Sequence, residues 1–128
     1  MRIAERIEAF AELGKKLDNI AEEELENISG SARAKNGWFT ADSIRNGLEG
    51  ISFMLKKEKL EKWVANHRPT EVPKIVGIVM AGNIPLVGFH DLLCVLISGH
   101  FAAVKPSSDD EILTKKIVIT TWFYCRKM

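Results

Sequence analysis

The sequence predicts an α/β protein that begins with helices. These are followed by the first strand–helix–strand unit of a doubly wound parallel sheet, and the rest of that sheet is missing from the chain. Two observations carry this prediction: residues 1–67 place apolar residues at helical intervals among charged ones, whereas residues 74–128 hold short Val- and Ile-rich segments around an apolar helix. Between them, RPTEVP at 68–73 contains two prolines, which stop a helix. We therefore divide the chain into a helical region at 1–67, a linker at 68–73 and the start of an α/β domain at 74–128.

The helical region is predicted to contain a loop. Apolar residues from Ile3 to Ile20 recur at intervals of three, four or seven, as in one amphipathic helix or two. The segment SGSARAKNG at 29–37 is rich in small and turn-forming residues, which indicates a loop. Thr40 is a plausible N-cap for a following helix, and EKLEKWVANH then forms a third helix or continues the second.

The second region begins with the pattern of a parallel sheet. KIVGIVMAG at 74–82 is apolar on both alternating faces, which favours a strand covered on both sides. We expect Asn83 to cap a buried helix with Pro85 in its first turn, and Gly99 to end that helix. HFAAVKP is then a second parallel strand, which completes a βαβ unit.

The carboxyl-terminal residues are predicted to add a helix and a strand. Ser108 and Glu111 have the spacing of a capping box at the start of DDEILTKKIV. The β-prone, apolar IVITTWFYC at 117–125 is typical of a further strand. Because two or three strands are few for this architecture, we expect the chain to be the opening of a larger domain. We also expect the 128-residue chain to self-associate through strand edges and the IVITTWFYC surface, which the rest of such a domain would cover.

Composition argues against several classes of protein. The 128 residues include 18 basic and 17 acidic side chains, so no strong field favours nucleic acid. No window approaches the roughly 20 apolar residues of a membrane span, and the charged amino end is unlike a signal peptide. Two cysteines are too few for a disulfide framework. These features favour a cytoplasmic protein.

The candidate binding residues lie in two loops, AGNIP at 81–85 and KPSSDD at 105–110. In open α/β sheets, ligands bind beyond the carboxyl ends of the strands, where both loops are expected. Gly82 would let a ligand approach the backbone, and Asn83 would add a side-chain donor at a helix amino end. The alternative is that Asn83 only caps the helix.

The usual dinucleotide fingerprint, G-x-G-x-x-G followed by an acidic residue, is absent. Where that acid would stand, the chain has Lys105, which can donate to ribose hydroxyls or pair with a 2′-phosphate, with Ser107 nearby. The alternative is a solvated lysine before a turn.

The sequence gives little support for a metal site or for a histidine or cysteine that acts in catalysis. His90 and Cys94 are four residues apart, but no second pair completes a metal site, so none is predicted. His90 and Asp91 are interpreted as a buried polar pair. Cys125 is interpreted as a poor nucleophile because it lies three residues from the terminus, where nothing would hold it still.

Residues 76–110, VGIVMAGNIPLVGFHDLLCVLISGHFAAVKPSSDD, resemble the start of the cofactor domain in the aldehyde dehydrogenase superfamily. Its members carry an Asn-x-Pro turn, a buried helix, a Gly-bounded turn and a Lys-Pro-Ser ending. AGNIPLVGFHD, with NGWFTADSIRNGLEGI at 36–51, is more specifically similar to the acyl-CoA reductases that include the fatty-acid reductase of bacterial luminescence. The resemblance covers about residues 36–118.

The resemblance implies a Rossmann-type sheet and a set of roles. Asn83 would donate its amide to the oxyanion formed when a cysteine attacks an acyl-CoA thioester. The backbone of Gly82, Ile84 and Pro85 would border the nicotinamide of NADPH or NADH, while Lys105 and Ser107 would bind the adenosine ribose or its phosphate.

In the resembling enzymes the nucleophilic cysteine lies far downstream, so we expect this chain to be an amino-terminal part that is inactive alone. The alternative is a non-catalytic module that keeps the fold opening for nucleotide binding or for oligomerisation.

Overall fold

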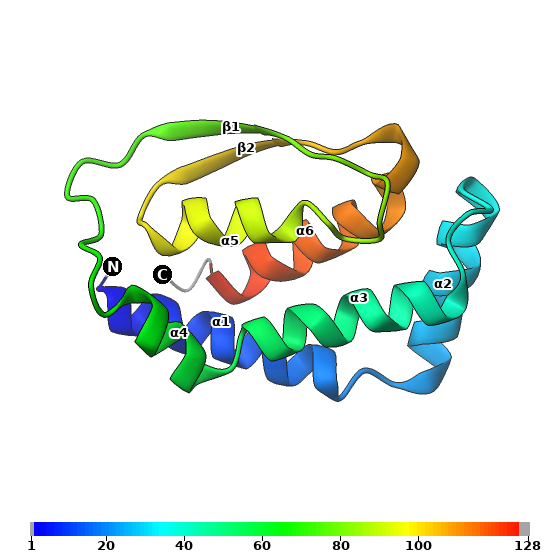
Figure 1. The fold of residues 1–128 in the computed structure, drawn as a ribbon, viewed down its shortest axis with the longest axis horizontal. Helices are drawn as coiled ribbons and strands as arrows, with labels where there is room; N and C mark the ends of the chain where they lie inside the picture. The colour runs from blue at the N-terminus through cyan, green and yellow to red at the C-terminus, as the bar shows by residue number, and fades with distance from the viewer. Residues whose placement is uncertain (1, 126–128) are drawn as a thin grey trace.

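The chain is arranged in three layers, with a two-stranded sheet above, two helices in the middle and the amino-terminal helices below (Figure 1). A computed structural model describes residues 2–125. The elements are α1 (Ile3–Asp18), α2 (Glu22–Lys35), α3 (Ala41–Met54), α4 (Lys57–Val64), β1 (Ile75–Val79), α5 (Phe89–Ile97), β2 (Phe101–Lys105), the short 3-10 helix η1 (Ser108–Asp110) and α6 (Glu111–Cys125). Within these residues the mixture of helices with parallel strands confirms an α/β fold.

The first third contains two helices, and the loop predicted at 29–37 is wrong over most of its length. Helix α2 continues to Lys35, with Leu25, Ser29 and Ala32 buried on one face. That face packs against α3 and α6. The small residues therefore allow close helix packing, a tertiary effect that outweighs their loop propensity.

The predicted N-cap of α3 is confirmed. The backbone N–H of Ser43 donates to Thr40 Oγ1 at 3.0 Å, and Ile44 and Ile51 are buried on the inner face. Helix α4 is separate from α3, because α3 ends at Met54 with Leu55 as its C-cap and α4 begins at Lys57.

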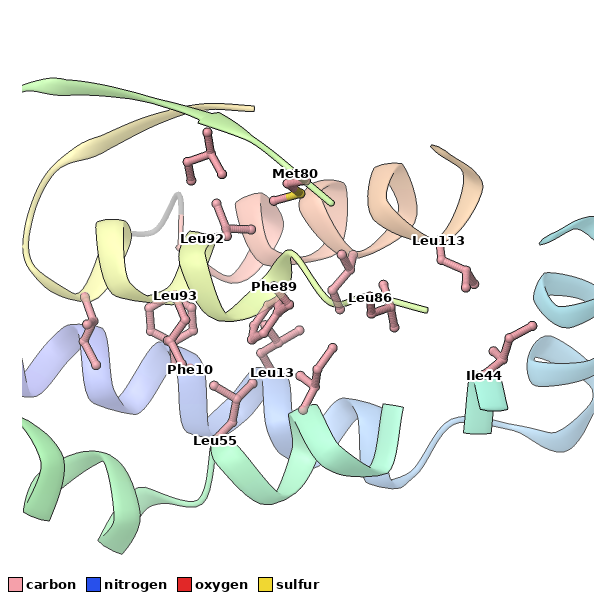
Figure 2. Close-up of a cluster of buried hydrophobic side chains, with 14 of the residues drawn as sticks. Phe10, Leu13, Ile44, Leu55, Met80, Leu86, Phe89, Leu92, Leu93 and Leu113 are labelled. Atoms are coloured by element: carbon pink, nitrogen blue, oxygen red, sulfur yellow. The ribbon is translucent and has the colours of Figure 1, made fainter. Parts of the chain in front are cut away.

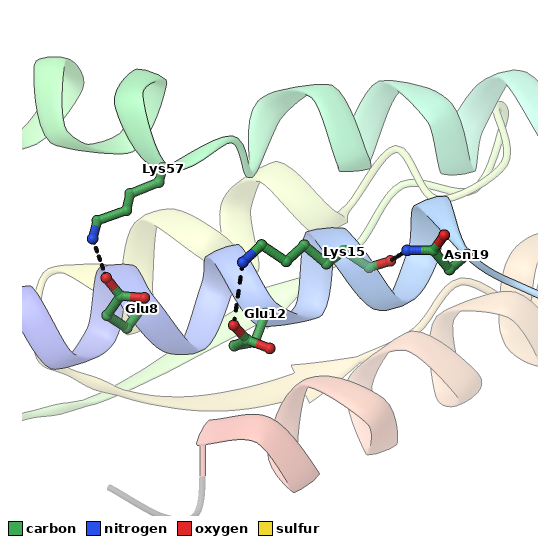
Figure 3. A network of polar contacts seen from close by, with 5 residues as sticks. All are labelled: Glu8, Glu12, Lys15, Asn19 and Lys57. Carbon is green, nitrogen blue, oxygen red and sulfur yellow. Dashed lines mark hydrogen bonds and ion pairs between the residues drawn. The ribbon is translucent and has the colours of Figure 1, made fainter.

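Polar contacts on the outer surface fasten α4 to α1 (Figure 3). The Lys57 ammonium pairs with the Glu8 carboxylate, which lowers the pKa of Glu8 and raises that of Lys57. Further along α1, Lys15 Nζ lies 3.4 Å from Glu12 Oε1, and Asn19 Nδ2 donates to the Lys15 carbonyl at 2.8 Å. The same Lys15 carbonyl also accepts the Asn19 backbone N–H at 3.1 Å, so Asn19 closes the end of α1 through both its backbone and its side chain.

Strands β1 and β2 pair in parallel, from Ile75 opposite Phe101 to Val79 opposite Lys105, and α5 connects them. This confirms the predicted βαβ unit. Gly99, with φ of +96°, follows the end of α5 as predicted.

The prediction of a sheet covered on both sides is wrong for the described residues. Helix α5 covers one face, where Ile78 is buried. On the other face Ile75, Val79 and Phe101 are 77%, 81% and 62% exposed. Helix α6 packs against α1 and α2 and lies on the same side of the sheet as α5, so it does not cover the second face (Figure 1).

The strand predicted at 117–125 is also wrong, because these residues continue α6. Buried residues recur at helical spacing along α6, and the Thr120 and Thr121 hydroxyls donate to the carbonyls four residues back. Among the described side chains of α6, the buried residues are Leu113, Thr114, Ile117 and Thr121. Packing on α1 and α2 therefore overrides the strand preference of β-branched residues. Arg126, Lys127 and Met128 lie outside the described residues.

One hydrophobic cluster joins residues on both sides of the linker. Figure 2 shows Phe10 and Leu13 of α1 beside Phe89 of α5, with Met80 between α5 and β1. The helical region and the α/β region therefore share a core. No helix within residues 2–125 combines the length and the apolar character needed to cross a bilayer.

Candidate functional site

Two loops lie against each other at the carboxyl end of the sheet, as the sequence predicts. The Met80 N–H donates to the Lys105 carbonyl at 3.0 Å, so both strands end at the same edge. Gly82 is buried, and a Cβ added there would overlap Ser107 Oγ and lie 2.5 Å from Ser107 Cβ. Gly82 thus allows the AGNIP and KPSSDD loops to touch.

The prediction that Asn83 caps the buried helix, with Pro85 in its first turn, is wrong. Helix α5 begins at Phe89 with Gly88 as its N-cap. Residues 83–88 form a bend and turns, with the Val87 N–H donating to the Ile84 carbonyl at 3.2 Å. Leu86 has φ of +62°, in the left-handed region, so the chain cannot wind into a helix before this point.

Asn83 is consequently an exposed side chain and not part of a cap. Its amide makes no hydrogen bond with any described residue, which leaves both N–H groups available to a ligand. The expected help from the dipole of a helix amino end is lost, because α5 starts six residues later.

Ile84 and Pro85 differ in their surroundings. The Ile84 side chain is 56% exposed beside Asn83. Pro85 is buried against α3, where its carbonyl lies 3.1 Å from the position that a Cβ on Gly47 would take. Pro85 therefore anchors the loop to the helical layer.

The loop conformation depends on Asp110, a residue that the sequence interpretation missed. Asp110 is only 3% exposed, and its Oδ2 accepts the Leu86 N–H at 2.6 Å. Its Oδ1 is buried without a hydrogen-bond partner among the described residues. Burial raises the pKa of this carboxyl to about 6, while the bond from Leu86 acts in the opposite direction.

Asp110 thus holds Leu86 in a conformation that non-glycine residues rarely adopt. Such strain persists only where the surrounding structure enforces it, and it gathers at functional sites. In the sequence, an acidic residue at the start of a helix is an ordinary feature, so no signal marked Asp110. Only its burial shows its role.

Lys105 and Ser107 occupy the second loop. Lys105 is exposed at the end of β2. The Ser107 hydroxyl accepts the Asp109 N–H at 3.2 Å and caps η1, so the capping box predicted at Ser108 is wrong. The loop is tied to the helical layer because Asn36 Nδ2 donates to the Asp109 carbonyl at 2.9 Å.

The histidines and cysteines form no metal centre within residues 2–125. Cys94 Sγ lies 3.7 Å from His90 Nδ1, whereas His100 Nδ1 accepts the Lys74 N–H at 3.1 Å. His90 and Asp91 are both exposed, so the predicted buried polar pair is wrong. The side chain of Cys125 lies outside the described part of the chain.

Two pockets in the described chain lie away from this edge. One of about 140 Å³ is enclosed by α1, α2, α3 and α6 with Leu86. Another of about 320 Å³ lies between α4, the linker and α5. Neither Asn83 nor Lys105 lines either of these two pockets. Compared with known proteins, the chain matches no family model, no curated protein and no solved structure.

Proposed function

We propose that this chain is the amino-terminal part of an NAD(P)H-dependent acyl-CoA reductase, which converts an acyl thioester to an aldehyde through a cysteine thioester. Its two strands would be the first of a Rossmann-type sheet. The observation that carries the proposal is the contact of Gly82 with Ser107, because it unites the two loops that bear Asn83 and Lys105. The carboxyl edge of a parallel sheet is where α/β proteins bind ligands.

The residues at this edge suit complementary roles. The Asn83 amide is a neutral donor able to stabilise negative charge on a thioester oxygen. The Lys105 ammonium would donate to an adenosine ribose or pair with its 2′-phosphate, and the Ser107 hydroxyl would add a donor. A reduced nicotinamide would supply the hydride.

Cys94 is not the nucleophile in this proposal. Burial, assisted by the Asp91 carboxylate, raises the pKa of the Cys94 thiol. A thiol with a raised pKa holds little thiolate at neutral pH, and thiolate is the attacking form. Cys94 also lies on α5 and not in either loop. We therefore propose that the chain is inactive alone. A cytoplasmic location belongs to the same proposal, and the free Cys94 thiol is compatible with it.

The proposal is tested by cofactor titration with a matched lysine control. Lys105 and Lys74 are both exposed, but Lys105 ends β2 at the carboxyl edge, whereas Lys74 precedes β1 at the opposite edge. We expect NADPH to raise the melting temperature of the wild-type chain and of Lys74→Ala, and Lys105→Ala to lose this shift. If millimolar NADPH and NADH leave the wild-type melting temperature unchanged, the proposed cofactor site is wrong.

A second candidate function is self-association, which the open sheet face favours. Ile75, Val79 and Phe101 are exposed together on that face. Exposed apolar patches of this kind mark interaction surfaces, and a two-stranded sheet is marginally stable without further contacts. A concentration-independent monomer in sedimentation velocity would rule this candidate out.

A further inference from the structure

A second pocket, remote from the two loops, has the features of a ligand site. It has a volume of about 320 Å³ and lies between α4, residues 67–69 and α5, with Ile3 of α1 at its border. Ile3, Val64 and Ile97 supply apolar surface. This volume is at the lower end of the range for small-molecule sites, so it suits a ligand with a single ring.

The polar side of this pocket includes one fixed positive charge, that of Arg68. His67 and Arg68 both line it and are exposed, and no acidic residue contributes to the lining. Arg68 forms no ion pair with any described carboxylate. Because a guanidinium presents two parallel N–H donors, Arg68 is suited to bind a carboxylate through both oxygens.

The segment that carries Arg68 is fixed at both ends. The His67 N–H donates to the Val64 carbonyl at 2.9 Å, and the Thr70 N–H donates to the Ser98 carbonyl at 2.8 Å. Arg68 lies between these two attachments, one to α4 and the other to the end of α5. Its backbone is therefore placed before any ligand arrives, which reduces the entropy lost on binding.

Trp63 provides an aromatic wall that is also held in place. Its ring centroid lies 5.9 Å from that of His90, with a tilt of 35° between the planes. His90 in turn contacts Cys94 Sγ at 3.7 Å. The Trp63 side chain keeps 39% of its surface exposed, so part of the ring is open to a second aromatic ring.

We propose that this pocket binds a small aromatic carboxylate, whose ring packs against Trp63 and the apolar residues while its carboxylate pairs with Arg68. The site is independent of the proposed reductase function, because it shares no residue with the two loops. It also gives a role to His90 and Cys94, which orient the Trp63 ring.

Benzoate is a suitable probe in an NMR titration of the full ¹⁵N-labelled chain. We expect saturable shifts of the Trp63 indole N–H, identified by its loss in Trp63→Phe, and no shift of the indole of Trp38, which is 92% exposed. Benzamide, which lacks the charge, should bind at least about tenfold more weakly. Cyclohexanecarboxylate, which lacks the aromatic ring, should bind about two- to tenfold more weakly.

Two arginine variants complete the test. Arg68→Gln should weaken benzoate binding at least about tenfold, whereas Arg33→Gln, an exposed change on α2, should leave it unchanged. An unchanged NMR spectrum without ligand would show that both variants fold. Equal affinities for benzoate and benzamide, equal affinities of the two variants, or the absence of a saturable shift at Trp63 would each overturn the proposal.

Discussion

Replacing Asp110 with asparagine is expected to stabilise the chain at neutral pH. The carboxyl is buried, and burial raises its pKa from 3.8 to about 6. Because one pKa unit corresponds to about 1.4 kcal/mol, the ionised form destabilises the folded chain by on the order of 3 kcal/mol at pH 7. The neutral amide of Asp110→Asn avoids this effect and keeps an oxygen that can accept the Leu86 N–H.

The sign of the effect fixes its dependence on pH. The pKa is higher in the folded than in the unfolded chain, so the folded chain binds more protons between about pH 4 and pH 6. The free energy of unfolding of the wild-type chain should therefore fall across this interval through Asp110. The variant should lack this contribution, so the two chains should be similar below about pH 4 and differ most above about pH 6.

Urea unfolding followed by circular dichroism, between pH 4 and pH 7.5, measures both quantities. Asp110→Ala is the matched control, because it also removes the charge but leaves the Leu86 N–H without an acceptor. We expect it to be about 1–3 kcal/mol less stable than Asp110→Asn at every pH. The reasoning is refuted if Asp110→Asn is less stable than wild type at pH 7, or if their difference does not change with pH.

Further changes test the packing of the helices, one cap and the sheet face. Gly14→Ala should lower the free energy of unfolding by about 1–3 kcal/mol, because the new Cβ would stand 2.9 Å from Leu55 Cβ between α1 and α3. Gly30→Ala should raise the free energy of unfolding by about 0.5–1 kcal/mol, because the new Cβ would meet no atom within 4 Å beyond its own stretch of α2. Equal effects of the two changes in urea unfolding would contradict this packing. Thr40→Ala removes the acceptor of the Ser43 N–H, which should lower the free energy of unfolding by about 1 kcal/mol and lower the melting temperature accordingly. An unchanged melting temperature would mean that the cap does not contribute to stability. Phe101→Lys should shift the sedimentation coefficient toward that of a monomer, whereas persistence of the same assembly would exclude the open face as its interface.

Local sequence patterns correctly predicted those elements in which the backbone preference of the residues and their tertiary packing favour the same structure. Thr40 caps α3, Gly99 follows the end of α5, and the segments KIVGIVMAG and HFAAVKP supply two strands that pair in parallel. In each of these cases the backbone preference of the residues and the apolar surface that they bury favour the same structure.

The predictions of secondary structure are wrong where contacts between residues far apart in the sequence determine the local conformation. The β-branched run after Lys116 becomes helical because α6 packs on α1 and α2, and small residues near Ser29 remain helical for a similar reason. Neither partner is visible from local spacing. The start of α5 is delayed by Leu86, whose conformation depends on Asp110, 24 residues away along the chain.

The sequence correctly predicted where the candidate loops lie, but not the local structure around Asn83. The sequence placed Gly82, Asn83, Lys105 and Ser107 in two loops, and the structure confirms that both loops leave the same edge of the sheet. Asn83 was expected at a helix terminus and is instead exposed in a turn. Its proposed role therefore depends on the free amide alone.

An NMR titration of the ¹⁵N-labelled chain with NADPH tests the central claim most directly, because it locates any binding at single residues. We predict saturable shifts of the Gly82, Asn83 and Ser107 backbone amides and of the Asn83 side-chain amide. Amides at the opposite edge of the sheet, such as those of Lys74 and Gly99, should not move. Unchanged loop amides at millimolar NADPH, or shifts confined to the opposite edge, would contradict a cofactor site at the two loops.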